Sequence, residues 1–452
     1  MKIEVLLVDQ INDKINNFDE NLNLFEANNF EAKQNEMFFM SNFNSSEETT
    51  TLIVGTNGCE TEYDFVKLGS LIGQKLNKDC EVQLTAIPDN LNMFMIEFGI
   101  MLSTYNFQNF KSNKSSEVNI DILDSEFTTE IENKVKSIFW VRDMVNFPAL
   151  TKSPDFFEHK VEEFIDGLDI NFKSYDQKWI EENNMGGVIG VSQGSDRPPK
   201  FLVGEYNSKA KKQIALIGKG VLFDSGGLSL KSPAGMETMK TDMAGAATAW
   251  GIIALVAKEG LDIGLKVYTP IVENMPSGSA IRPGDILSMR NGKSIEVMNT
   301  DAEGRLIMAD ALAYASESNP DIICDVATLT GAAYVALGVE IGAVFSNNKT
   351  TLESFLNSND DGFENYHPLP LEQSYKSLIK SNIADMKNSG GRFGGAITAA
   401  LLLEEFVNDL DWVHLDIAGP ARSRSNNSIY PEGGTGFGVL GYFNFLTNEA
   451  IS

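Results

Sequence analysis

Cysteine and histidine are scarce in this chain of 452 residues, with three of each. The cysteines, Cys59, Cys80 and Cys324, are odd in number and far apart, so they predict neither a disulfide framework nor a cysteine-based metal site. With so few histidines, a histidine-rich metal centre and the helical HExxH pair are also excluded. If the protein binds metal ions, carboxylates must supply the ligands.

Basic side chains are also few, since 36 Lys and Arg stand against 63 Asp and Glu. Residues 1–127 alone hold 21 acidic and 8 basic side chains, a balance that repels phosphate backbones and disfavours a nucleic-acid partner. No stretch approaches the ~18 uncharged apolar residues of a membrane span. The N-terminus has no cleavage site typical of a signal peptide. These absences together favour a cytoplasmic protein without a membrane partner.

Two domains are expected from the length and from the 42% of hydrophobic residues, which suffice for sizeable cores. Residues 1–127 mix short β-rich runs with helical spacing, as in "TTLIVGTN" and "EYDFVKLGSLIGQKL", and predict a small α/β domain. Another helix is predicted for "NMFMIEFGIMLSTYNF" (92–107). Residues 128–146 predict a long connecting helix, and we place the boundary at its start. The larger domain then covers 128–452.

The second domain alternates strands and helices, which indicates a central mixed sheet covered by helices and an α/β protein overall. "KKQIALIGKGVLF" predicts one buried strand, and "METMKTDMAGAATAWGIIALVAKEG" predicts one long helix that ends at Gly260. "DILSMRNGKSIEVMN" predicts a hairpin whose turn is Asn291-Gly292. The helix "EGRLIMADALAYASES" follows.

Asp301 and Glu303 lie between this hairpin and this helix. In an extended segment, residues two apart point to the same side, so both carboxylates can face one point. The positive end of the following helix favours their ionised form. The alternative is an ordinary helix start with acids in its first turn.

A second polar segment, "GKGVLFDSGGLSLK", carries Lys219, Asp224 and Lys231 out of the buried strand. A charged lysine in an apolar strand is costly unless it is paired or deprotonated. The spacing of a phosphate-binding GxxxxGK[ST] loop is absent. The alternative is a turn at a strand end with lysines on the surface.

Asp242 lies among Met239, Met243 and small residues, where a carboxylate needs a partner; the alternative is a residue that caps a helix. With the two other segments it gives four carboxylates and only two lysines. Leaving such carboxylates buried without neutralisation is strongly unfavourable. Two divalent cations would resolve the imbalance, in the arrangement that two-metal enzymes use.

Several long motifs in series resemble the leucyl aminopeptidase family, the M17 cytosol aminopeptidases. The resemblance is close over about residues 140–448 and weaker in the first domain. The motifs that carry it are "IGKGVLFDSGGLSLK", "DMAGAATA", "NMPSGSAIRPGDI", "NTDAEGRLIMADALAYA", "ATLTGA", "GGRFGGAITAALLLEEF" and "HLDIAG".

This resemblance implies a role for each matching position. Two divalent metals, zinc or manganese with magnesium or cobalt as further candidates, would be held by Lys219, Asp224, Asp242, Asp301 and Glu303. Asp224 and Glu303 would bridge them, and Lys219 would bind as a neutral amine. Lys231 would polarise the substrate carbonyl, and Arg305 would hold a bicarbonate base with help from Lys231, Gly304 and Leu329. The substrate would be bound by Met239, Asp242, Thr328, Leu329, Gly331 and Ala418.

The function implied is removal of Leu and other apolar N-terminal residues from short peptides by a water that two metals activate. The resemblance also implies a homohexamer. Three alternatives stay open on the sequence: another two-metal hydrolase such as a phosphoesterase, a DNA-binding architectural protein, which the net charge disfavours, and a metal-free structural subunit.

Overall fold

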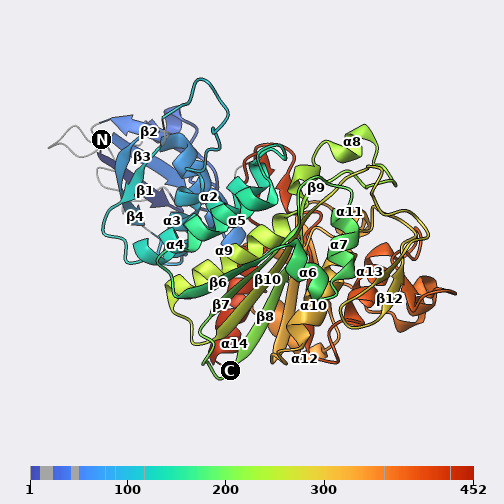
Figure 1. The fold of residues 1–452 in the computed structure, drawn as a ribbon. Coiled ribbons are helices and arrows are strands. Elements are labelled where there is room, and N and C mark those ends of the chain that lie inside the picture. The colour runs from blue at the N-terminus through green and yellow to red at the C-terminus, as the bar shows by residue number, and fades with distance from the viewer. Residues whose placement is uncertain are drawn as a thin grey trace. The chain divides into compact units, whose positions relative to one another are not determined.

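The computed structural model describes residues 2–10, 24–41, 50–76, 78–86, 88–116, 118–360, 362–427 and 429–451 (Figure 1). The chain divides into two compact units. One consists of Met1–Val135, Asp361–Phe363 and Asn426–Pro431, and the other of Lys136–Asp360, Glu364–Ser425 and Glu432–Ser452. The division falls inside α4 (Thr128–Asn146), the long helix that the sequence predicts. We retain as a proposal that the second domain begins at the start of this helix.

The smaller unit is built on a five-stranded mixed sheet in the order β2-β3-β1-β4-β5. Strand β1 pairs in parallel with β3 and β4, whereas β2 is antiparallel to β3. Helices α2 and α3 pack closely because Gly69 has no side chain. A Cβ at this position would lie 1.9 Å from the Ile96 carbonyl oxygen. The elements are β1 (Lys2–Val8), β2 (Met37–Ser41), β3 (Thr50–Gly55), α2 (Glu62–Leu76), β4 (Cys80–Ala86), α3 (Met93–Leu102) and β5 (Ile120–Ile122).

Helix α3 is shorter than the sequence predicts, since it ends at Leu102 rather than near Phe107. The hydroxyls of Ser103 and Thr104 donate to carbonyls of the preceding turn, at 2.7 and 2.8 Å. Side chains of this kind compete with the helical backbone ladder, which accounts for the early end.

The larger unit is built on a nine-stranded sheet in the order β15-β14-β17-β13-β8-β10-β7-β6, with β9 paired to β10. The central strands β17, β13, β8 and β10 are parallel neighbours, while β14, β7 and β6 introduce antiparallel pairs. The predicted mixed sheet and α/β class are confirmed. The strands are β6 (Ile170–Tyr175), β7 (Lys200–Tyr206), β8 (Gln213–Gly218), β9 (Gly220–Asp224), β10 (Gly264–Asn274), β13 (Ile322–Ala327), β14 (Ile341–Ser346), β15 (Asn365–Pro368) and β17 (Trp412–Asp416).

Helices cover both faces of this sheet (Figure 1). On β8, Ala215 and Ile217 belong to the core that includes α10, whereas Gly218 lies against α9, where an added Cβ would be 2.6 Å from the Gly245 carbonyl oxygen. No described helix is long and apolar enough to cross a membrane. The longer helices are α5 (Pro154–Ile165), α9 (Ala244–Glu259), α10 (Gly304–Ser316), α12 (Lys349–Asn357), α13 (Gly395–Glu404) and α14 (Val439–Ile451), and the shorter ones are α6 (Gln177–Glu182), α7 (Gly186–Ser192), α8 (Pro233–Met236), α11 (Gly331–Leu337) and the 3₁₀ turns η1 (Met239–Thr241) and η2 (Gln373–Ile379).

The predicted hairpin is confirmed, with β11 (Ile286–Ser288) antiparallel to β12 (Ser294–Glu296) and Gly292 in the turn at φ 86°. Strand β12 also pairs in parallel with β16 (Met386–Lys387). A separate two-stranded pair joins β18 (Arg422–Ser423) to β19 (Gly433–Gly434).

Two sequence predictions around Lys219 are wrong, and one local feature explains both. The predicted single strand is broken into β8 and β9 at Lys219, and the predicted long helix starts only at Ala244. The Lys219 N–H donates to the Val326 carbonyl (3.1 Å), and its carbonyl accepts from the Ala246 N–H (2.8 Å). The Lys219 N–H therefore still bonds to β13, whereas its carbonyl leaves the strand ladder and satisfies a free N–H in the first turn of α9.

A buried carboxylate, Glu364, fastens the start of α14. Its Oε1 accepts from the Gly438 N–H (2.9 Å), and its Oε2 accepts from the Gly441 N–H (2.8 Å) and the Tyr366 hydroxyl (2.5 Å). Burial raises the pKa of Glu364 to about 7, although the three hydrogen bonds oppose the rise. Protonation of Glu364 therefore stabilises the folded state relative to the unfolded state.

We expect this stabilisation to be complete below the pKa of an unfolded glutamate, about 4.3, and to be lost as the pH rises through 7. Glu364→Gln removes the titration. The free energy of unfolding of the wild type minus that of the variant should fall by on the order of 2–3 kcal/mol from pH 4 to pH 8. Urea titrations across this range measure it, with the exposed Glu340→Gln as control. A difference that does not change with pH would contradict the expectation.

Candidate metal centre

The Lys219 side chain is buried at the junction between β8 and β9, where it joins two acidic segments. Its Nζ lies 2.7 Å from Asp242 Oδ1 and 3.0 Å from Glu303 Oε1, and it donates to the Thr328 carbonyl (2.9 Å). Gly304 leaves room for this side chain, because a Cβ there would lie 2.5 Å from Lys219 Cε. Three chain segments far apart in sequence thus converge on one ammonium group.

Lys231 makes the second such link, in the loop after β9. Its Nζ lies 2.8 Å from Asp224 Oδ2 and 2.5 Å from Asp301 Oδ1. The loop turns back through Gly226 (φ 85°), where a Cβ would lie 2.8 Å from Asp301 Oδ1. The glycine turn therefore lets the backbone approach the Asp301 carboxylate closely.

The carboxylates of Asp224, Asp242 and Glu303 gather at one buried point. One oxygen of each lies within 4.8 Å of the others, the spacing of a group that can hold a metal ion. Asp301 is not in this group; it joins the site through Lys231, and its side chain is 32% exposed. The structure thus brings all five predicted ligands into one site, with three carboxylates at its centre.

Two carboxylate oxygens in this cluster, Asp242 Oδ2 and Glu303 Oε2, are buried and have no hydrogen-bond partner among the described residues. Glu303 is the N-cap residue of α10, but its side chain makes no capping bond to the described backbone. An ordinary helix cap therefore does not account for this acid. Unpartnered oxygens on ionisable groups are costly when buried, and a divalent cation with oxygen ligands satisfies them. The donor set fits such a cation.

Electrostatics at the site reflect burial and the crowding of like charge. Burial and the neighbouring Glu303 raise the pKa of Asp224, and burial raises that of Asp242 well above its ordinary value. Burial lowers the pKa of Lys219, but the surrounding carboxylates outweigh it, so the pKa is raised overall. Lys219 is thus an ammonium as long as carboxylates are its partners, and a neutral amine requires cations in their place.

Arg305 lies in the first turn of α10 and is buried. One guanidinium nitrogen, NH1, donates to the Asn388 carbonyl (2.8 Å), while Nε has no hydrogen-bond partner in the described part of the chain. Burial lowers the pKa of Arg305 to about 10, although the negative charges of Glu303 and Asp416 act to raise it. A buried guanidinium with a free donor is suited to hold a small anion.

Of the predicted substrate-binding residues, Thr328 contacts the cluster directly, and two others have their N–H groups already engaged. The Thr328 hydroxyl donates to Asp242 Oδ1 (2.9 Å), and Met239 opens η1, the turn just before Asp242. The N–H groups of Leu329 and Ala418 both donate to Asp416 Oδ1, each at 3.1 Å. The Leu329 N–H is therefore committed to Asp416 and leaves its carbonyl for other partners.

Three buried polar residues that support the site were missed in the sequence. Asn274, at the end of β10, donates to Asp224 Oδ1 (2.8 Å) and to the Thr300 carbonyl (3.0 Å), so it ties two ligand segments together. Asp416 holds the Leu329 segment by accepting from the Leu329 N–H, and the Asn388 carbonyl holds Arg305 by accepting from its guanidinium. Their only signal is a polar residue within or just after a short apolar strand, which is common elsewhere.

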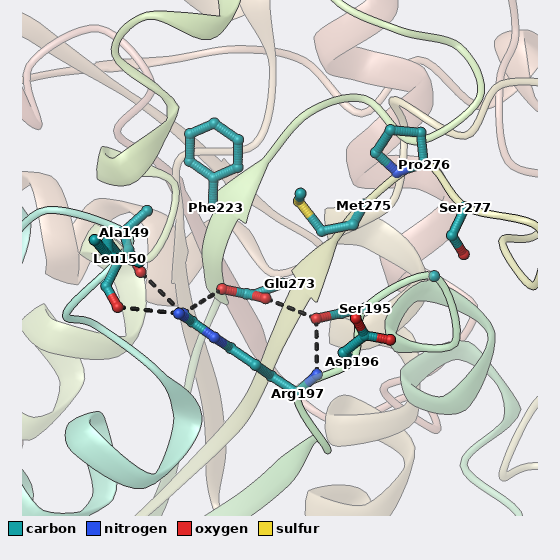
Figure 2. A pocket seen from close by; sticks show the side chains of 11 residues that line it. Ala149, Leu150, Ser195, Asp196, Arg197, Phe223, Glu273, Met275, Pro276 and Ser277 are labelled. Atoms are coloured by element: carbon teal, nitrogen blue, oxygen red, sulfur yellow. Dashed lines mark hydrogen bonds and ion pairs between the residues drawn. The ribbon is translucent and has the colours of Figure 1, made fainter.

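A cavity of about 500 Å³ includes none of the predicted site residues (Figure 2). Arg197 lines it and donates to the Ala149 and Leu150 carbonyls (2.9 and 3.0 Å) and to Glu273 (2.9 Å). Ser195 also donates to Glu273 (2.7 Å), so Arg197 and Glu273 are partners of each other in this cavity. Two of its lining residues, Phe223 and Glu273, directly precede Asp224 and Asn274 in the sequence.

Comparison with known sequences agrees with this geometry. The model of the cytosol aminopeptidase family, catalytic domain, matches residues 139–441. A probable cytosol aminopeptidase of Syntrophotalea carbinolica is 42% identical over 367 residues, which cover 78% of this chain and 74% of that protein. One from Clostridium perfringens is 34% identical over 469 residues, covering 96% and 95%.

Comparison with solved structures extends the similarity to the whole chain. The bottromycin maturation enzyme BotP in complex with Mn has a TM-score of 0.91 at 28% identity and is covered to 99%, as is this chain. The cytosol aminopeptidase from Coxiella burnetii has a TM-score of 0.88 at 29% identity, covering 100% of this chain and 97% of that one.

Glu303→Gln should bind at least one metal ion fewer per chain than the wild type, because a neutral amide replaces an unpartnered carboxylate oxygen at the centre of the cluster. Elemental analysis of protein dialysed against Mn²⁺ measures the ratio. Glu237→Gln, which changes an exposed acid five residues before Asp242, is the control. An unchanged metal content in Glu303→Gln would remove this residue from the ligand set.

Proposed function

The chain belongs to the cytosol aminopeptidase family and is a metal-dependent aminopeptidase that acts on peptides, and from that premise we propose which residues carry its reaction. Two divalent ions would be bound per chain. The resemblance to the family favours zinc or manganese, with magnesium and cobalt as further candidates, and carboxylate oxygens suit manganese and magnesium. Their ligands would be Lys219, Asp224, Asp242, Asp301 and Glu303, with Asp224 and Glu303 shared between the ions.

The observation that carries this proposal is the pair of buried, unpartnered oxygens on Asp242 and Glu303 beside Asp224. When bound, two such ions supply Lewis acidity and a nucleophile at neutral pH. The other tasks fall to the chain. Asp242 Oδ2 would accept a hydrogen bond from the α-amine of the peptide. The Lys231 ammonium would donate to the peptide carbonyl oxygen as negative charge develops there.

Arg305 would hold bicarbonate, which would supply the general base. The free Nε of its guanidinium and its burial support this role. Gly304, which directly precedes Arg305, and Lys231 would assist. The Leu329 backbone would contribute its carbonyl, because its N–H is committed to Asp416. A bicarbonate hydroxyl can donate to that carbonyl while its oxygens accept from the guanidinium.

The side chain of the first peptide residue would lie among Met239, Thr328, Gly331 and Ala418. This lining offers apolar surface and no counter-charge, which supports a preference for Leu and similar residues. We further propose a homohexamer in the cytoplasm that admits short peptides. The support for this proposal is the resemblance to the family.

Metal-stripped protein should regain hydrolysis of leucine p-nitroanilide when Zn²⁺ or Mn²⁺ is added. The Leu substrate should exceed the Asp and Lys substrates in kcat/KM, because each buried methylene is worth about 0.8 kcal/mol and the lining cannot pair a charge. Assays with the three anilides and with p-nitrophenyl phosphate test this. Phosphatase turnover above peptidase turnover would contradict the proposal, and a peak at Asp would misplace the pocket.

Arg305→Ala should keep the fold and the metal content, while kcat falls by roughly the 10²–10⁴ of a lost general base. In CO₂-depleted buffer, added bicarbonate should stimulate the wild type and leave the variant unchanged. Arg305→Lys should be intermediate, since an ammonium cannot grip a planar anion at two points. An equal bicarbonate response in wild type and Arg305→Ala would remove Arg305 from the mechanism.

A further inference from the structure

Asn388 is a fully buried residue that directly follows β16, and none of its hydrogen bonds goes to the side chain of a proposed ligand. Its N–H continues the pairing of β16 with β12 by donating to the Glu296 carbonyl (3.0 Å). The chain then leaves the sheet toward α13. Asn388 is thus anchored by its backbone at the edge of a small sheet, next to the loop that carries Asp301.

Every hydrogen-bonding position of the Asn388 carboxamide is used by that loop. Oδ1 accepts from the N–H groups of Met298 (2.8 Å) and Asn299 (3.2 Å). Nδ2 donates to the carbonyls of Asn299 (2.7 Å) and Ala302 (3.2 Å). An uncharged amide of this length offers two acceptor and two donor positions at once, and an acid or a hydroxyl does not.

The backbone carbonyl of Asn388 accepts a hydrogen bond from NH1 of the Arg305 guanidinium, at 2.8 Å. One residue therefore holds the loop around Asp301 with its side chain and Arg305 with its main chain. The Asn388 carbonyl fixes NH1, while Nε has no hydrogen-bond partner among the residues described. The direction in which the guanidinium offers its remaining donors depends on where Asn388 sits.

We propose that Asn388 is a positioning residue for the reaction, which sets the guanidinium of Arg305 relative to the metal-ligand loop. The inference rests on the role proposed above for Arg305. Catalytic groups must be held closely, because a displacement of about 1 Å can cost on the order of 10²-fold in rate. Loosening the 298–302 loop and the Asn388 carbonyl together would disturb that geometry without removing a ligand.

Asn388→Asp tests this, because it keeps the acceptor for Met298 and Asn299 but turns an anion toward two carbonyls. Its kcat should fall about 10–10²-fold, with KM changed less than about threefold, since the pocket and Asp242 are untouched. The matched control is Asn359→Asp, a buried asparagine whose Nδ2 donates to Phe355 and Gly441 (2.8 and 3.2 Å), far in sequence from the site. It should lower the melting temperature and leave kcat unchanged.

A double-mutant cycle with Arg305→Ala separates positioning from general damage. In the Arg305→Ala background, Asn388→Asp should lower kcat by less than about threefold, because the residue it positions is gone. Asn388→Ser, which replaces the carboxamide with one hydroxyl, goes through the same cycle should Asn388→Asp not fold. A folded Asn388 variant with wild-type kcat, or effects that multiply fully, would overturn the inference while leaving Arg305 in place. Full activity of Arg305→Ala alone would refute the role of Arg305 first, and the inference with it.

Discussion

The repulsion among buried carboxylates is the constraint on which the catalytic unit depends. Asp224, Asp242 and Glu303 present oxygens within 4.8 Å of one another. Lys219 and Lys231 form the ion pairs with them, and the neutral groups of Asn274 and Thr328 add hydrogen bonds. Lys219 and Lys231 each bridge two acids, yet two buried oxygens stay without a partner. Burying charge is tolerated only when it is paired and hydrogen-bonded. This shortage of positive charge weakens the metal-free protein, and it also gives the site its affinity for divalent cations.

The scaffold holds this unfavourable cluster with parallel strand ends, glycines and buried amides. β8, β13 and β17 run in parallel, and the segments that leave them reach one edge of the sheet, as ligand sites of α/β proteins do. Gly226 and Gly304 let the backbone come close where a side chain would collide with Asp301 and Lys219. Asn274 and Asn388 then tie the ligand loops to each other with uncharged groups, which adds rigidity without adding to the negative charge.

The sequence predicts the α/β class, the mixed sheet and the grouping of ligand segments, because apolar periodicity and long motifs are local. It could not predict the break at Lys219 or the late start of α9, since both depend on one hydrogen bond between residues 219 and 246. Asn388 was beyond reach for the same reason. The partners of its carboxamide lie 86 to 90 residues away in the sequence. Nothing in "DMKNSGG" distinguishes this residue from a loop asparagine. The commitment of the Leu329 N–H to Asp416 likewise appears only in three dimensions.

Anomalous diffraction from crystals grown with Mn²⁺ would show whether two metal ions share this carboxylate cluster. We expect two peaks about 3.5–4 Å apart. Both should lie within coordination distance of Asp224 and Glu303, with Lys219 or Asp242 and Asp301 completing the sites. A single peak, or peaks only in the cavity between Ala149 and Ser277, would contradict it.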